Sequence, residues 1–334
     1  MRRPFVDNAR ALGIILVVLG HAWLDSAAVT IIYAFHMPLF FFISGALWKP
    51  SVWQDGWRAF VTKQVRTLLV PYLCFGLISW LIMLAARAAL DQSTDARPSL
   101  VASLTPLAYG AGRSLREING TLWFFTALMM TNLYYFVLGR VPSRVLQIAI
   151  ALAVAILALT FRQQHTDVLP WNVDVAAVAL VFFVLGQSLL GNQQEQHWRP
   201  RGLLAALAGI FAAACVAMAL NNPDRVDLRS LTVGSTPLFF GGAIAGVLAT
   251  ILLAMIVPAS RIAAEISKAS IVIFPMHVIC LLAFQVLEKR FWGVPETFAE
   301  QWPRGIAYAV ASLLVCLPLY WFLKRFLPFC IGGR

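Results

Sequence analysis

Charge is scarce in this sequence of 334 residues. Only 12% of the residues are charged, whereas 60% are hydrophobic. Soluble globular domains carry about 25% charged and about 45–50% apolar residues. Together with a mean hydropathy of +0.78, the scarcity of charge excludes an ordinary soluble protein and predicts an integral membrane protein.

Cysteine is also rare, and its spacing carries no metal or disulfide pattern. The chain has five cysteines, no CxxC pair, and no cysteine pair in a polar loop. Disulfide frameworks and cysteine-based metal sites need such pairs. We therefore expect no disulfide and no metal, with buried thiols acting as small apolar side chains.

The sequence has no internal repeat, no low-complexity tract and no long polar loop. We therefore expect one membrane-embedded domain over residues 1–334 and no soluble domain. The absence of an inverted repeat removes a sequence cue that is typical of many transporters. No small-residue cleavage site follows the first apolar run, so we expect that run to be retained as a helix.

Ten apolar segments are long enough to span a bilayer as helices, which takes roughly 17–25 residues each. They predict an all-α, polytopic membrane protein with about ten transmembrane helices. The segments cover, approximately, residues 5–24, 30–48, 68–86, 120–138, 145–161, 173–190, 203–220, 235–257, 270–287 and 304–323.

The net charge of +11 invites a nucleic-acid partner, but the positions of the basic residues argue against one. If the N-terminus is cytoplasmic, sixteen of the 26 basic residues and four of the 15 acidic residues fall on the cytoplasmic side. This asymmetry is the positive-inside bias of membrane proteins. We therefore expect both termini in the cytoplasm, the lipid bilayer as a partner, and no nucleic acid.

The first apolar segment contains RALGIILVVLGH, in which ten uncharged residues separate Arg10 from His21. On an α-helix these two positions share one face and lie about 16 Å apart along the axis. Asp7 lies within about 40° of the same line. The pattern predicts a polar stripe with Asp7 and Arg10 near the cytoplasmic end and His21 near the outer end. An anion-binding arginine and a proton-accepting histidine at this separation would suit a coenzyme A thioester lying along the helix.

Simpler interpretations of the stripe remain open. Arg10 could reach the cytoplasmic headgroups while paired with Asp7, and His21 could make a structural hydrogen bond between helices. His36 opens the second segment at a depth similar to that of His21. The two imidazoles could face each other, so that one acts as a general base near neutral pH while the other orients it or holds substrate.

Three residues around the fourth segment are weaker candidates. Asn119 and Trp123, with nearby backbone amides, could stabilise an oxyanion, although Trp123 also suits a membrane-interface anchor. Glu117 could hold a sugar hydroxyl or orient a histidine, although a solvated loop charge is the favoured interpretation.

Five segments together resemble the acyltransferase 3 family of integral membrane acyltransferases, nearest to its fucose 4-O-acetylase type. The spacing of Arg10 and His21 is that family's signature, and the other segments follow in family order over nearly the whole chain. They are HMPLFFFISG from His36, KQVRTLLVPY around Arg66, NGTLWFFTALM from Asn119, and SIVIFPMH ending at His277.

The resemblance implies an O-acyltransferase that moves an acetyl group from cytoplasmic acetyl-CoA to a hydroxyl of a cell-surface or lipid-linked carbohydrate. It implies a multi-pass protein of the bacterial cytoplasmic membrane. Because a thioester needs no metal to be activated, we expect the reaction to use none. It also implies His21 as the catalytic residue, Arg10 and Arg66 as donor-binding residues, and His277 near the acceptor. The last segment departs from the family pattern, because Pro275 and Met276 stand where tyrosine and leucine are more usual.

Several alternatives stay open at this stage. The acyl group could be succinyl or longer, and the reaction could pass through a ternary complex or an acyl-enzyme. A transporter or flippase for a polar small molecule or a lipid-linked sugar is the alternative function. Pro275 is its candidate helix break, since transporters often place broken helices at the midplane.

Overall fold

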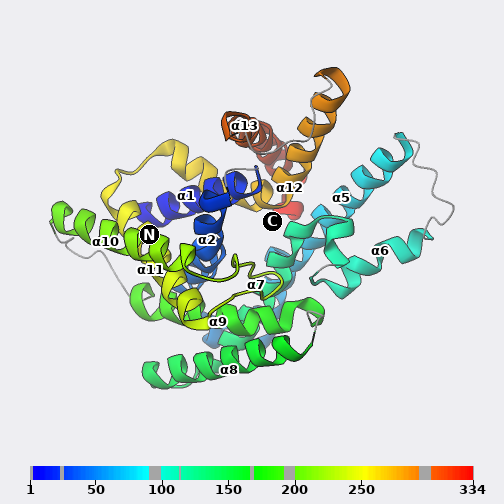
Figure 1. The fold of residues 1–334 in the computed structure, drawn as a ribbon. Coiled ribbons are helices and arrows are strands. Elements are labelled where there is room, and N and C mark those ends of the chain that lie inside the picture. The colour runs from blue at the N-terminus through cyan, green and yellow to red at the C-terminus, as the bar shows by residue number, and fades with distance from the viewer. Residues whose placement is uncertain are drawn as a thin grey trace. The chain divides into compact units, whose positions relative to one another are not determined.

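The structure is a computed structural model, shown in Figure 1, and its described residues are helical apart from turns and loops. Within them there is no β-strand, only an isolated bridge between Asp227 and Thr232. The all-α prediction is thus confirmed. The described residues are 3–22, 26–89, 99–112, 114–165, 169–191, 200–292 and 302–333.

Ten helical segments within these ranges are long and apolar enough to cross a membrane, which confirms the predicted number. The cytoplasmic placement of the termini stays a prediction. The segments are Pro4–His21, Ala27–Ala46, Gly56–Ala86, Gly120–Leu138, Arg144–Gln164, Pro170–Leu190, Arg201–Leu220, Thr236–Ile256, Arg261–Phe291 and Pro303–Phe326.

Two of these helices begin earlier than the apolar pattern predicts. Helix α4 (Gly56–Gln64) continues through a π-helical turn (Val65–Leu69) directly into α5 (Val70–Ala89). Pro71 lacks a backbone N–H, which favours irregular helical hydrogen bonding in the preceding turn. Helix α12 (Arg261–Trp292) begins nine residues before the apolar run, in a charged turn where Lys268 donates to Glu265 at 2.5 Å.

The chain forms two compact units. The first unit comprises Met1–Lys49 and Val181–Trp321, and the second comprises Pro50–Leu180 and Phe322–Arg334. The boundaries fall after α2 (Ser26–Ala46) and within α9 (Val173–Leu190) and α13 (Trp302–Phe326). The expectation of a single domain stays a prediction, and each unit is described by itself below.

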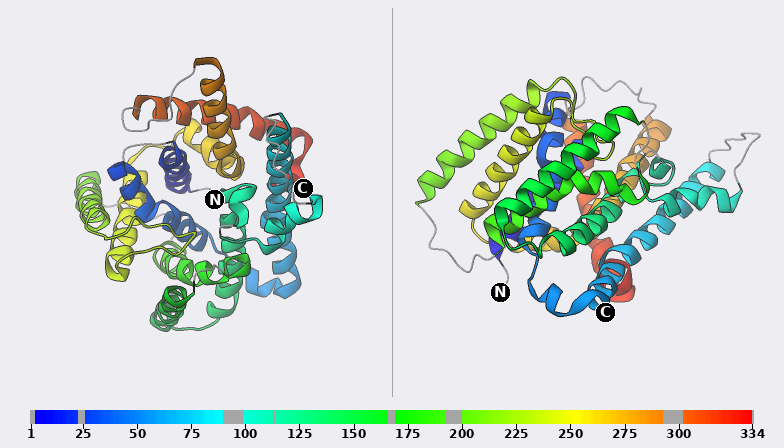
Figure 2. Two further views of the ribbon diagram at one scale, coloured as in Figure 1. Left: turned by 45° about the vertical axis from the view of Figure 1, so that its right-hand side comes forward. Right: turned by 90° about the horizontal axis from the view of Figure 1, so that it is seen from below.

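In the first unit, α1 (Pro4–His21) packs against α2, α11 (Thr236–Ile256) and α12. Helices α10 (Arg201–Leu220) and α11 run side by side, as both views in Figure 2 show. The Asn8 side chain donates to the carbonyls of Ala254 at 3.2 Å and Val257 at 3.0 Å. This contact satisfies carbonyls that the end of α11 leaves without helical partners and fixes α1 against that end.

The first unit also contains a very close approach of two backbones. A Cβ atom placed on Gly45 of α2 would lie 1.9 Å from the carbonyl oxygen of Phe183 in α9. Reciprocally, a Cβ atom on Gly186 would lie 1.9 Å from the carbonyl oxygen of Phe42. Small residues permit this kind of close packing between membrane helices.

The second unit holds α5, α6 (Leu100–Tyr109), α7 (Trp123–Leu138), α8 (Arg144–Gln164) and the first part of α9. Side-chain hydrogen bonds connect its helices. The buried Tyr72 hydroxyl donates to the Leu107 carbonyl at 2.7 Å, and Asn132 donates to Gln64 at 2.9 Å. The cysteines of both units are free thiols, and all except Cys74 are buried, as expected for small apolar side chains.

Candidate active site

The predicted polar stripe lies on one continuous helix, because α1 runs unbroken from Pro4 to His21. Both ends of the stripe meet α12. At one end Ser267 donates to the Asp7 carboxylate at 2.9 Å, and the Asp7 charge acts on the nearby Arg10. At the other end the rings of His21 and His277 meet edge to face, 4.9 Å between centroids. The stripe therefore lies along the interface between α1 and α12.

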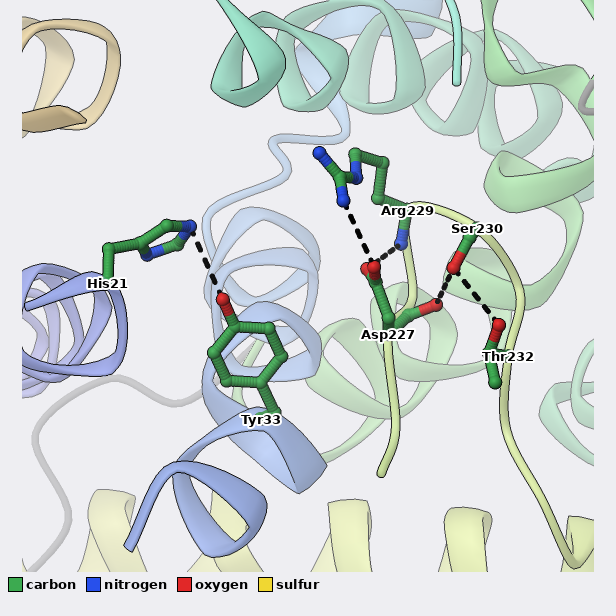
Figure 3. A network of polar contacts seen from close by, with 6 residues as sticks. All are labelled: His21, Tyr33, Asp227, Arg229, Ser230 and Thr232. Carbon is green, nitrogen blue, oxygen red and sulfur yellow. Dashed lines mark hydrogen bonds and ion pairs between the residues drawn. The ribbon is translucent and has the colours of Figure 1, made fainter. Parts of the chain in front are cut away.

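The hydrogen bonds of His21 select one tautomer of its ring. Nδ1 lies 2.8 Å from the carbonyl oxygen of Val17, one turn earlier in α1. A carbonyl can only accept a hydrogen bond, so Nδ1 carries the proton and Nε2 of the neutral ring keeps a lone pair. The Tyr33 hydroxyl lies 3.4 Å from that Nε2 and donates to it, as Figure 3 shows.

His36 and His277 are held by the same kind of bond. Nδ1 of His36 lies 2.8 Å from the carbonyl of Ile32, and Nδ1 of His277 lies 2.9 Å from that of Ile273. Each ring therefore also directs a basic Nε2 away from its own helix. Among the described residues, Nε2 of His277 has no hydrogen-bond partner.

Tyr33 connects two of the histidines. Its ring centroid lies 5.8 Å from that of His21 and 4.9 Å from that of His36. Tyr33 thus contacts both rings, and His277 packs on His21. The pairing of His21 with His36 stays a prediction. His36 is 3% exposed and His277 is fully buried, whereas His21 and Tyr33 are half-buried. His21 and Tyr33 are therefore the more exposed of the four rings.

A loop between α10 and α11 adds charges that the sequence analysis did not single out. The Arg225 guanidinium lies over the Tyr33 ring, 4.9 Å from its centroid. Arg229 and Asp227 form an ion pair at 3.2 Å, with side chains that are 19% and 20% exposed. All three charges act on His21, and in Figure 3 the Arg229 side chain extends from the loop toward the side where His21 lies. The signal available in the sequence was the segment RVDLR between two apolar runs.

Four further candidates from the sequence belong to the second unit. Arg66 is exposed and lies in the π-helical turn, a local geometry that is frequent at functional sites. Glu117 is also exposed, at the end of a 3₁₀ turn (Ser114–Glu117), as expected of a solvated loop charge. The Trp123 side chain is 6% exposed, so its burial does not fit an interface anchor in contact with headgroups.

Asn119 uses its side chain within the second unit. Its amide oxygen accepts from the Thr121 hydroxyl at 2.6 Å and from the Thr121 backbone N–H at 3.1 Å. Its amide nitrogen donates to the Ser79 hydroxyl at 3.0 Å. These bonds cap a 3₁₀ turn (Gly120–Leu122) that leads into α7. Asn119 therefore has a structural role in the second unit.

Among the residues that the structure describes, no group of three or more His, Cys, Asp or Glu side chains could hold a metal ion. The polar groups around His21 are instead a base with an oriented lone pair, a phenol and two guanidinium groups. This constellation is suited to proton transfer in a multi-pass membrane protein.

The chain belongs to the acyltransferase 3 family: the family's profile, described as an acyltransferase domain, matches residues 3–321. With ten helical segments that are long and apolar enough to cross a membrane among its described residues, it is a multi-pass membrane member of that family. It is similar to Nodulation protein NolL of Mesorhizobium japonicum, with 25% identity over 221 residues. The match covers 63% of this chain but only 54% of that protein, so it spans about half of the relative's length. No solved structure matches the chain.

Proposed function

We propose that this membrane acyltransferase moves an acetyl group from cytoplasmic acetyl-CoA to a hydroxyl of a cell-surface or lipid-linked carbohydrate. The observation that supports this most directly is the oriented lone pair of His21. A sugar hydroxyl is a poor nucleophile at neutral pH, and a positioned base corrects this deficiency. His21 is held in the tautomer that offers such a base, and the residue is only half-buried.

The reaction requires no group beyond the two substrates and the protein. The acceptor hydroxyl gives up its proton to the His21 site as its oxygen attacks the thioester carbonyl. The carbon–sulfur bond then breaks, and coenzyme A leaves with the proton. The proposal assigns no step to Asn119, whose amide bonds Ser79 and Thr121. Trp123 and Glu117 stay predicted contacts for the acceptor or the oxyanion, and His277 stays a predicted acceptor contact.

The donor is proposed to bridge the two polar ends of α1. Arg10 carries a permanent positive charge about 16 Å from His21, a separation comparable to the length of the pantetheine arm. The Asp7 carboxylate accepts from Ser267 and is thereby fixed at the same end of the helix. This contact allows Asp7 to orient Arg10 toward the anionic part of acetyl-CoA. Arg66 is proposed as a second donor contact.

The side of action and the location are part of the proposal. The positive-inside bias places Arg10 near the cytoplasm and His21 near the outer face of a bacterial cytoplasmic membrane. For the transporter alternative, the expected helix break is missing, because α12 runs from Arg261 to Trp292 without interruption at Pro275.

The test is acetyl transfer by the purified protein in lipid nanodiscs. Radiolabelled acetyl-CoA is supplied with a panel of free and lipid-linked glycans, and labelled glycan is separated and counted. We expect His21→Ala to lower kcat by about 10²–10⁴-fold, the usual contribution of a general base. Arg10→Ala should chiefly raise KM for acetyl-CoA.

His165→Ala is the matched control, because His165 is exposed at the end of α8 in the second unit. It should retain wild-type turnover. Wild-type protein that binds and consumes no acyl-CoA, while glycan flux across the bilayer depends on His21, would overturn the proposal in favour of transport.

A further inference from the structure

We propose that Tyr33 is a second catalytic residue, which passes the proton of the acceptor hydroxyl to His21. The inference rests on the proposed function and adds the route by which the proton reaches the base. None of the sequence patterns assigned a role to Tyr33. It follows from the contacts of its hydroxyl and of its ring.

The first observation concerns the group that occupies the His21 lone pair. With Nδ1 bonded to Val17, the neutral ring has one remaining acceptor, Nε2, in the plane of the ring. The Tyr33 hydroxyl already lies there, at 3.4 Å. An acceptor hydroxyl must therefore either displace Tyr33 or donate its proton to the Tyr33 oxygen. That oxygen keeps acceptor capacity while its own hydrogen points to His21.

The second observation concerns how exposed each of the rings is. Tyr33 and His21 are both half-buried, whereas the neighbouring His36 and His277 are buried. The rings of Tyr33 and His36 are in contact, with 4.9 Å between centroids, so the phenol is packed on its inner side. Packing of this kind keeps the hydroxyl beside His21 and makes its displacement by substrate costly.

The third observation concerns the positive charge next to the phenol of Tyr33. The Arg225 guanidinium lies over the face of the Tyr33 ring, 4.9 Å from the centroid. A cation in this position attracts the electron density of the ring and favours negative charge on the phenol oxygen. Negative charge develops there while the Tyr33 proton moves to His21. The Asp227–Arg229 ion pair and a backbone bridge from Asp227 to Thr232 fold the loop that carries Arg225.

The transfer balances without any added reagent. The acceptor O–H gives its proton to the Tyr33 oxygen as the Tyr33 O–H gives its own to Nε2 of His21. The acceptor oxygen forms a bond to the thioester carbonyl carbon, and the carbon–sulfur bond breaks. The imidazolium proton then goes to the departing thiolate, so that His21 and Tyr33 return to their starting states.

The decisive variant is Tyr33→Phe, assayed in nanodiscs with acetyl-CoA and a glycan that the wild type acetylates. We expect kcat to fall by about 10²-fold or more, as for other positioned proton-transfer groups, with little change in KM for acetyl-CoA. The control is Tyr308→Phe, which removes a hydroxyl that bonds Glu288 on α12. Its turnover should equal that of the wild type.

A second readout separates a relay from a positioning role. Diethyl pyrocarbonate modifies an unprotonated imidazole nitrogen, and mass spectrometry quantifies modification of the peptide containing His21. Tyr33→Phe should accelerate this modification, because Nε2 loses its covering hydroxyl, while acetyl transfer becomes slower. Opposite changes support the relay. A parallel loss of both would mean that Tyr33 only positions His21, and wild-type kcat in folded Tyr33→Phe would mean that substrate displaces it; either result overturns the relay.

A loop variant tests the same inference without altering a helix. Arg225→Ala should lower kcat by roughly threefold to tenfold, the range expected for a cation–π contact. Arg140→Ala is the matched control, because Arg140 also lies over an aromatic ring, 4.7 Å from the Phe136 centroid in the second unit. An unchanged kcat in Arg225→Ala would remove the electrostatic support for the relay. An inactive wild type, by contrast, would refute the proposed function itself.

Discussion

The two units of this protein use polar side chains differently. In the first unit, close backbone contacts such as Gly45 with Phe183 hold helices together, while His21 and His277 keep an Nε2 lone pair directed away from their own helices. In the second unit, polar side chains form hydrogen bonds with one another. Asn132, for example, donates to the Gln64 side chain at 2.9 Å, and Arg144 donates to the Tyr135 hydroxyl at 3.1 Å.

The difference between the units shows how to rank candidate catalytic residues among the segments that resemble the family. Asn119 and His21 both lie in segments that resemble the family, yet Asn119 bonds to Ser79 and Thr121 inside its own unit. In a membrane, an unsatisfied polar group is costly, so helix packing will use any polar group that chemistry does not need. A ring nitrogen whose partner is another group capable of proton transfer, as His21 Nε2 is beside the Tyr33 hydroxyl, is therefore the better indicator of reactivity.

The largest expected effect on folding comes from Gly45→Ala. The new methyl group would meet the Phe183 carbonyl oxygen at 1.9 Å, so α2 and α9 would have to move apart. We expect a loss of about 3 kcal/mol in the free energy of unfolding, at the upper end for overpacked sites. Thermal unfolding in detergent measures it. Gly209→Ala, which meets no atom within 4 Å, is the control and should be neutral or slightly stabilising. Equal stability of the two variants would show that the close backbone contact at Gly45 does not hold the helices of the first unit together.

A smaller loss is expected for Asn119→Ala. Removing the amide leaves Thr121 and Ser79 without their partner and costs about 2 kcal/mol, as for other buried hydrogen bonds. The kcat of the folded fraction should stay within about twofold of the wild type, since the groups that perform proton transfer lie elsewhere. Stability and turnover are measured on the same nanodisc preparation. A stable but inactive Asn119→Ala would instead place this residue in the chemistry.

The smallest effect is expected for Ser267→Ala. Asp7 loses one hydrogen bond, and Arg10 loses part of its orientation, so KM for acetyl-CoA should rise about threefold to fivefold, equivalent to roughly 0.6–1 kcal/mol. Initial-rate kinetics with varied acetyl-CoA measure it, and kcat should be unchanged. Ser260→Ala, just before α12, is the control, because the Ser260 hydroxyl accepts from the Ala263 N–H at 3.4 Å and so caps that helix. A fall in kcat without a change in KM would contradict the orienting role.

Helical periodicity alone accounts for much of the first unit. It predicted ten apolar spans and placed Asp7, Arg10 and His21 on one face of the first helix, and the structure confirms that this helix is continuous. Apolar runs could not predict where α12 begins, because its first turns are charged and pair within the helix through Glu265 and Lys268.

The residues that contact His21 could not be predicted from the sequence. Tyr33 stands twelve positions from His21, and which face of α2 meets α1 depends on packing between helices. Arg225 lies in a loop whose path is set by the backbone bridge between Asp227 and Thr232. A loop of this kind has no helical periodicity from which the position of Arg225 could be predicted. His36 illustrates the same limit, since its depth in the second segment suggested His21 as a neighbour and the structure places Tyr33 in contact with both.

The uncharged stretch between Arg10 and His21 has an electrical consequence. Protons travel through proteins along groups within hydrogen-bonding distance, about 3 Å apart, whereas this stretch separates the two polar ends of α1 by about 16 Å. Ile14, Val17 and Val18 within it are buried against neighbouring helices. Helix α1 thus carries polar groups at both ends of an apolar stretch without forming a continuous proton path between them.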